Sequence, residues 1–268
     1  MSEPAHVALL VAATRSVGVT VTDTFGAWVD GDPDRVEPTV VDRGDGQRTH
    51  LLDLPVGAVS VAYDAEVRRS APAASVAPVS VDDQLRYLRP SRYCPSDRFG
   101  GWAHREFDPM AELDAHDADQ QAALTAAVTS WVFERTDYVL GSSDGSDSAV
   151  DTLLSSQGVC RDFAHLVITI CRALDLPARL AAVYAPGLSP MDFHAVAEVC
   201  IGGRWLVFDA TALAPRPALL RIATGRDAAD TAFVTVYRGQ AELTSSTVNA
   251  VIEGDLPADD HDGRFELG

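Results

Sequence analysis

The stretch from Gly158 to Leu174, GVCRDFAHLVITICRAL, constrains the fold of this chain more than any other part of it. Its apolar residues at positions 163, 167, 170, 171 and 174 recur with the spacing of one helical face. Gly158 suits a tight turn before such a helix, and Pro177 prevents the helix from continuing. The pattern therefore predicts a turn followed by a buried helix that begins at or near Cys160.

The predicted place of Cys160 suits nucleophilic chemistry. The free N–H groups and the positive dipole end at the start of a helix stabilise a thiolate. A cysteine taken alone is more often a small buried apolar residue. Other residues of the sequence are needed to choose between a nucleophile and a buried apolar residue at Cys160.

Two later residues favour the catalytic interpretation. His194 opens the alternating stretch HAVAEVCI, and Asp209 ends WLVFD, a short apolar strand that follows the turn at Gly202 and Gly203. A hairpin of these strands would bring His194 and Asp209 to one sheet, on which the helix headed by Cys160 can pack. A cysteine nucleophile needs a base, and the base needs a group that orients it. These three residues supply those three roles.

Several blocks of the chain resemble the transglutaminase-like superfamily of cysteine enzymes, in its bacterial branch. The similar blocks are GVCRDFAHL, LPARLAAVY, FHAVAEV and GGRWLVFDAT, with extensions at YLRPSRYCPSD and GRDAADTAFVTVY. The resemblance implies Cys160 as nucleophile, His194 as base and Asp209 as its partner. It also implies an α+β fold with a papain-like core, in which a helix packs on an antiparallel sheet. The chain departs from the family at Val196, where Trp is common, and at Ala210, where Pro is common.

The predicted organisation has three parts. Residues 1–80 are expected to form a small β-sandwich, since their β-rich segments are short and broken by Gly, Asp and Pro; these segments are 6–14, 17–29, 36–41 and 58–68. Residues 81–252 are expected to form the catalytic core, which would include a helix over 117–135 and strands at 218–223, 232–237 and 243–252. The small-residue stretch 70–80 is expected to link the two. The acidic tail 253–268 is expected to be loosely ordered.

Composition disfavours several kinds of partner. The net charge of −18 argues against nucleic acid and anionic lipid surfaces, which bind basic proteins. No apolar run is long enough to span a membrane, and the first residues lack the basic start of a signal peptide. Four scattered cysteines suggest no disulfide framework, so we expect a cytoplasmic protein. All 21 basic residues are Arg, so the chain has no lysine amine through which its own copies could be cross-linked.

A metal site is a weaker interpretation of the same helix. Cys160, His165 and Cys171 are spaced five and six residues apart, which matches no common zinc pattern. We therefore expect neither a metal nor a cofactor, and structural roles for His165 and Asp162. Cys94 is expected to lie in a turn and to carry no chemistry.

The sequence as a whole predicts a cysteine-dependent enzyme that acts on an amide bond of a peptide or protein substrate. Cys160 would attack the carbonyl carbon and form a thioester. Water would then give hydrolysis or deamidation, whereas an amine would give transamidation, and the triad does not decide between them. The Cys160 N–H and a second, unidentified donor would bind the oxyanion. The alternative is a non-catalytic binding module that retains the fold.

Overall fold

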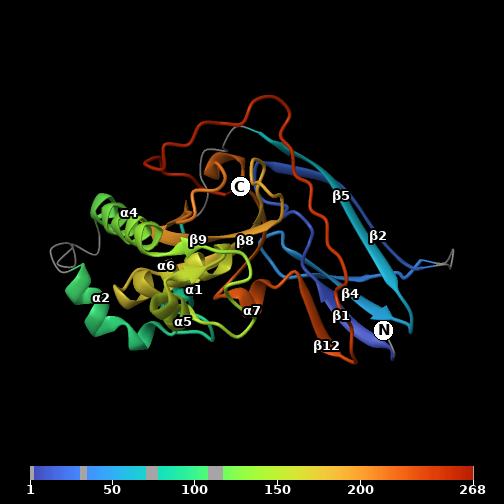
Figure 1. The fold of residues 1–268 in the computed structure, drawn as a ribbon. Coiled ribbons are helices and arrows are strands. Elements are labelled where there is room, and N and C mark those ends of the chain that lie inside the picture. The colour runs from blue at the N-terminus through green and yellow to red at the C-terminus, as the bar shows by residue number, and fades with distance from the viewer. Residues whose placement is uncertain (1–2, 31–34, 71–77, 108–116, 268) are drawn as a thin grey trace.

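The computed structural model describes residues 3–30, 35–70, 78–107 and 117–267, and confirms the predicted α+β class. Most helices gather around one antiparallel sheet, and a second region of long strands lies beside them (Figure 1). Within the described ranges, no helix is both long and apolar enough to cross a bilayer.

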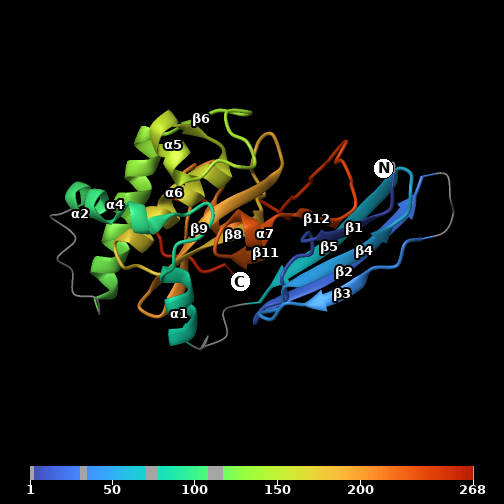
Figure 2. The same ribbon diagram turned by 90° about the horizontal axis from the view of Figure 1, so that it is seen from below.

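The strand region is the predicted small sandwich. One sheet has the order β12-β1-β4-β3, and β2 and β5 pair in a separate long ribbon (Figure 2). The strands are β1 (Ala5–Leu9), β2 (Val19–Val29), β3 (Thr39–Asp42), β4 (Arg48–Leu54), β5 (Val59–Arg69) and β12 (Val234–Arg238). Buried apolar side chains, including Val7, Ala27 and Leu52, form the core of this region. Because β12 follows the helical region in sequence, the first sheet is completed by a distant part of the chain. The boundary at residue 80 stays a prediction, and most of the expected linker (71–77) lies outside the described residues.

The second sheet carries the predicted catalytic core. It is antiparallel, with the order β10-β9-β8-β11. Its strands are β8 (Ala178–Tyr184), β9 (Phe193–Ile201), β10 (Arg204–Phe208) and β11 (Leu220–Gly225). Helix α6 (Cys160–Ala173) packs on β8 and β9. The predicted arrangement of a helix on an antiparallel sheet is thereby confirmed.

Further helices surround α6. Those that pack on it are α1 (Val81–Leu88), α2 (Gly100–Glu106), α4 (Ala118–Arg135) and α5 (Ala149–Ser155). Helix α4 starts as predicted, since the Asp117 carboxylate accepts the N–H groups of Asp119 and Gln120. Trp131 of α4 packs on the core and donates to Glu106, so it serves packing.

Between its ends, α6 is covered on every side, and not only on the predicted apolar face. Its residues from Asp162 to Arg172 are all buried. The polar members of this run lie three or four positions apart and form one stripe along the helix; they are Asp162, His165, Thr169 and Arg172. Buried polar groups are costly without hydrogen bonds, so this stripe has to find partners inside the protein.

Arg172 shows most clearly how the polar stripe obtains its hydrogen bonds. Its guanidinium donates to the backbone carbonyls of Ala178, Arg89 and Arg226, and to the Ser91 hydroxyl. These acceptors belong to three separate parts of the chain: the start of β8, the segment after α1 and the segment after β11. Arg172 therefore ties the C-terminal end of α6 to the loops around it.

The C-terminal segment corrects two sequence-based expectations. The expected strand at 243–252 is absent from the described structure, and that stretch is irregular. The expected loose order of 253–267 is wrong. Asp259 forms a buried ion pair with Arg216, with N···O distances of 2.8 and 2.9 Å, and the Phe265 carbonyl accepts the Val207 N–H at 2.8 Å. Charge in the sequence suggested a solvated tail, but a buried arginine supplies the partner that allows it to pack.

We predict that Arg172→Met lowers the free energy of unfolding by about 3 kcal/mol, because it leaves several buried carbonyls without a donor. Urea unfolding followed by tryptophan fluorescence measures this loss. Arg105→Met, at an exposed position of α2, is the matched control and should change stability by no more than about 0.5 kcal/mol. Equal stabilities for the two variants would contradict the structural role given to Arg172.

Candidate active site

Helix α6 begins at Cys160, as the sequence predicts, and the turn before it is tightly held. Asp162 Oδ2 accepts the Val159 N–H at 2.9 Å and the Ser143 hydroxyl at 2.5 Å. Gly158 is required here by close approach, because a Cβ on it would lie 2.6 Å from the Cβ of Asp162. The side chain of Asp162 therefore fixes the turn that presents Cys160.

His194 and Asp209 meet at the same sheet, on neighbouring strands. His194 is the second residue of β9, and Asp209 directly follows β10. His194 Nε2 and Asp209 Oδ2 are 2.8 Å apart, and both side chains are buried. The pairing predicted from the two strand patterns is thus present in the structure.

Thr211 is a site residue that the sequence reasoning did not single out. Its backbone N–H and its hydroxyl donate to Asp209 Oδ1, at 2.9 and 2.7 Å. The other oxygen, Oδ2, is left to face His194. The signal was present as an Asp followed two residues later by Thr, the spacing of an Asx turn. Both oxygens of the orienting carboxylate are therefore held.

The remaining ring nitrogen of His194 takes no part in the contact with Asp209. Nδ1 is buried and makes no hydrogen bond of ordinary geometry within the described part of the chain. Cys160 is nevertheless close enough that its hydrogen bonding and its charge act on the His194 ring. With Nε2 held by Asp209, Nδ1 is the nitrogen available to the thiol. Such contacts are often loose before substrate binds.

The electrostatics of the pair favour a charged imidazole. Burial alone lowers the pKa of His194, but the Asp209 charge, its hydrogen bond and Cys160 outweigh burial and raise that pKa to about 10. Burial raises the pKa of Asp209, but His194 and the Thr211 donors lower it overall. At neutral pH the site therefore holds a carboxylate and an imidazolium beside Cys160.

His165 lies on the same helix but has a different role. Its Nε2 accepts the Ala228 N–H at 3.1 Å, and its ring stacks on Tyr93. Burial lowers its pKa to about 4, so this ring is neutral at pH 7. The expected structural role of His165 is consistent with these contacts.

The other three cysteines are poor candidates for chemistry. Cys94, Cys171 and Cys200 are buried, whereas Cys160 is half-buried. Burial raises the pKa of both the Cys94 and the Cys171 thiol to about 12. Cys94 is a core residue and not merely a turn residue. Cys160 is the one thiol of the four with both access and a neighbouring histidine.

The two departures from the family pattern are both buried apolar residues. Val196 is buried in a second apolar cluster that includes Val207 and Leu267 from the C-terminal segment. Ala210 is buried in the main core. Neither side chain interrupts the His194–Asp209 contact.

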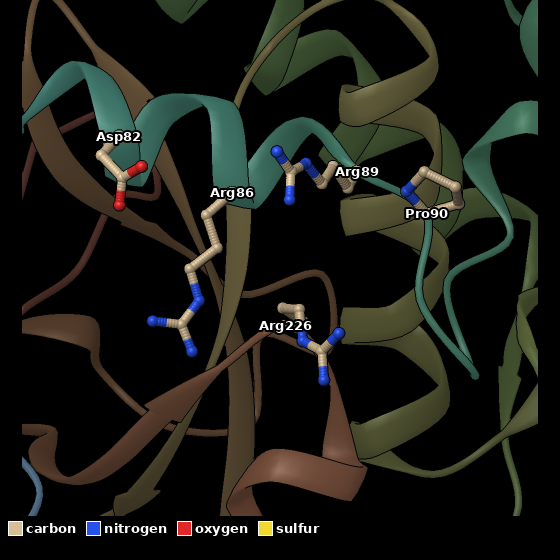
Figure 3. Close-up of a pocket in the computed structure, with 5 residues that line it drawn as sticks. All are labelled: Asp82, Arg86, Arg89, Pro90 and Arg226. Atoms are coloured by element: carbon tan, nitrogen blue, oxygen red, sulfur yellow. The ribbon is translucent and has the colours of Figure 1, made fainter.

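A separate concavity of about 350 Å³ is lined by Asp82, Arg86, Arg89, Pro90 and Arg226 (Figure 3). It lies where the carbonyls of Arg89 and Arg226 bind Arg172, twelve residues along α6 from Cys160. At 1.5 Å per residue, this is roughly 18 Å from the start of the helix. The concavity is therefore not part of the Cys160 site.

Comparisons with known proteins support the family resemblance and the fold class. A sequence model of the transglutaminase-like superfamily matches residues 111–210. The crystal structure of a candidate cysteine protease from Cytophaga hutchinsonii is 32% identical, covers 97% of this chain and 89% of that one, and superposes with a TM-score of 0.82. An uncharacterised protein of Mycobacterium leprae is 26% identical over 178 residues, which are 62% of this chain. The chain spans 59% of the length of that relative.

The fold and these relationships support a cysteine-dependent enzyme in general. The chain belongs to the transglutaminase-like superfamily. The roles of the three site residues stay a prediction.

We predict that iodoacetamide near neutral pH labels Cys160 well before the other three cysteines, because those thiols are buried and stay protonated. Mass mapping of peptides after limited labelling measures the order. His194→Ala should slow labelling of Cys160 by removing the imidazolium. Labelling of Cys94 with Cys160 untouched would contradict the assignment.

We predict that the pKa values of His165 and His194 are shifted in opposite directions. Nitrogen-15 NMR should show His194 protonated at pH 8 and losing its proton near pH 10, with His165 neutral down to about pH 4. Asp209→Ala should lower the His194 pKa strongly, because burial is then opposed only by the neighbouring Cys160.

The same pKa shifts determine how the free energy of unfolding changes with pH. His194 has a raised pKa in the folded state, so its stabilising contribution is complete below about pH 6.5 and is lost as the pH rises toward 10. Asp209 has a lowered pKa, so its contribution is present above about pH 4 and is lost as the pH falls further. A His194 signal that titrates near pH 6.5 in the wild type would contradict both statements.

Proposed function

We propose that this protein is a cysteine enzyme that cleaves or transfers amide bonds, with Cys160 as nucleophile, His194 as acid–base and Asp209 as the orienting group. The observation that carries the proposal is the buried His194–Asp209 pair, held at 2.8 Å, whose free ring nitrogen is available to the half-buried thiol at the start of α6. A buried ion pair of this kind is costly to form. A cysteine nucleophile needs an imidazolium beside its sulfur, and this need explains why the site contains so costly a pair.

In the proposed reaction the Cys160 thiolate attacks a carboxamide or peptide carbonyl carbon. The C=O electron pair moves to oxygen and forms an oxyanion. When the oxyanion collapses, the C–N bond breaks and His194 gives its proton to the leaving amine. This leaves a thioester on Cys160 and a neutral imidazole.

The second half-reaction regenerates the enzyme. His194 takes a proton from water or from a primary amine as either attacks the thioester, and the Cys160 thiolate leaves. Water gives an acid, as in a protease or deamidase, and an amine gives a new amide. The substrate we propose is a peptide or protein. Any acyl-accepting side-chain amine has to come from another molecule, because this chain has no lysine.

A tryptic digest of an unrelated protein tests the proposal, since it offers peptide bonds, glutamine amides and lysine amines together. Mass spectrometry in oxygen-18 water should show new acids carrying the label, or new amide cross-links. We expect Cys160→Ala to abolish every product and Asp209→Asn to slow turnover by about 10³- to 10⁴-fold, because a neutral amide cannot hold the imidazolium.

A control variant helps to distinguish catalysis from the alternative, a non-catalytic binding module. Thr129→Ala on α4 is a nearby neutral change, whose hydroxyl bonds only a carbonyl one turn earlier, and it should retain wild-type turnover. A wild-type product profile identical to that of Cys160→Ala would contradict catalysis. It would instead support the binding module that retains the fold.

A further inference from the structure

The concavity of about 350 Å³ beside the end of α1 is lined mainly by arginine (Figure 3). Arg86 and Arg89 extend into it from the α1 side, and Arg226 extends from the wall that follows β11. Asp82 and Pro90 complete the lining. Three guanidinium groups thus surround one small hollow, in a chain whose net charge is −18.

Both walls of the concavity are fixed from inside the protein by Arg172. Its guanidinium donates to the Arg89 carbonyl at 3.2 Å and to the Arg226 carbonyl at 2.6 Å. Arg172 is 3% exposed and lies near the end of α6, so it belongs to the interior and not to the lining. One buried side chain therefore holds the backbone from which two of the three cavity arginines project. Such fixed walls lower the ordering cost for a ligand that binds to both of them.

The positive charge of the concavity is only partly compensated by carboxylates. Within the described ranges, neither Arg86 nor Arg89 forms an ion pair, although Asp82 lies one helical turn before Arg86. Arg226 binds Asp230 through Nε and Nη2, at 2.9 and 3.2 Å, and its Nη1 takes no part in this pair. Burial raises the pKa of Asp230, but Arg226 and then Arg86 lower it overall, so guanidinium groups from both walls lie near one carboxylate. Like charges held together in this way favour an anion between them.

The chemistry of the lining points to a compact oxyanion with several negative charges. A guanidinium group is a planar fork that binds two oxygen atoms of a phosphate or carboxylate at once. Three forks around one hollow match the oxygen atoms of two adjacent phosphate groups. An acidic peptide instead spaces its carboxylates along a backbone of about 3.3 Å per residue, so few of them can enter one concavity. The observed volume also lies within the range of about 300–1,000 Å³ that is typical of small-molecule sites.

We propose that this concavity binds a small ligand with two adjacent phosphate groups, through Arg86, Arg89 and Arg226. Inorganic pyrophosphate and the diphosphate of a nucleotide share this chemistry. The ligand joins the end of α1 to the connection between β11 and α7 (Ala228–Thr231), and so stabilises the structure around the end of α6. No atom of the Cys160 site takes part, so binding here is independent of the reaction proposed above.

Isothermal titration calorimetry of the whole chain with sodium pyrophosphate, at low ionic strength and without divalent metal ions, measures binding. We expect one site per chain, and an affinity that falls about tenfold or more in Arg86→Gln and in Arg89→Gln, because each loses charged hydrogen bonds. Arg68→Gln on β5 is the matched control. Its side chain is 79% exposed in the strand region, so it removes the same charge and should leave the affinity unchanged. Cys160→Ala should also bind as the wild type does, whatever the outcome of the activity tests.

Thermal melting gives a second measurement that does not depend on the heat of binding. Saturating pyrophosphate should raise the melting temperature of the wild type and of Arg68→Gln, because a ligand that binds only the folded state stabilises it. The double variant Arg86→Gln with Arg89→Gln should show no such rise. Circular dichroism verifies that this variant is folded.

Other anions identify the ligand and show which results contradict the proposal. ADP that binds more tightly than pyrophosphate identifies a nucleotide, and ADP that binds no more tightly identifies the phosphate groups alone; both results support the site. No binding of pyrophosphate, or binding that the Arg86 and Arg89 variants leave unchanged, would overturn it. Equal affinities for sulfate and pyrophosphate would overturn it in favour of unspecific anion binding. Tighter binding of a polyaspartate peptide would overturn it in favour of an acidic protein partner.

Discussion

A helix that is buried on all sides has to satisfy its polar side chains within the protein, and the rest of this structure depends on how α6 does so. Asp162, at one end of its polar stripe, fixes the turn before Cys160 through the Val159 N–H and the Ser143 hydroxyl. Arg172, at the other end, binds carbonyls of the start of β8 and of two loops. The loops are therefore held by the same helix that presents the thiol. This coupling explains how a half-exposed cysteine can have a well-defined position.

Two buried histidines, His165 and His194, have pKa values that are shifted in opposite directions. His165 is buried without a carboxylate bonded to its ring, and its pKa falls. His194 is buried against Asp209, and its pKa rises. The difference arises because desolvation penalises an imidazolium unless an opposite charge compensates it. Thr211 completes this compensation by occupying the second oxygen of Asp209, which keeps the carboxylate charged and correctly turned.

Parts of the chain that are remote in sequence complete the molecule. Strand β12, near the end of the chain, pairs with β1 near its start, and the C-terminal segment lies along β10 through the Phe265 carbonyl. The Asp259 side chain is buried because it forms an ion pair with the buried Arg216. These contacts involve charged or irregular segments that look solvated when each is considered alone. Their packing follows from partners supplied by other elements.

The sequence by itself determined the helix that begins at Cys160, the strands that carry His194 and Asp209, and the sandwich at the start of the chain. Each of these has a local pattern: helical spacing, a strand alternation ended by a polar residue, or short β-rich segments between turns. Only the tertiary structure decided that the polar face of α6 is buried, that Arg172 binds carbonyls of distant segments, and that Asp259 of the C-terminal segment packs on Arg216. No local pattern encodes these features, because each depends on which distant group lies opposite.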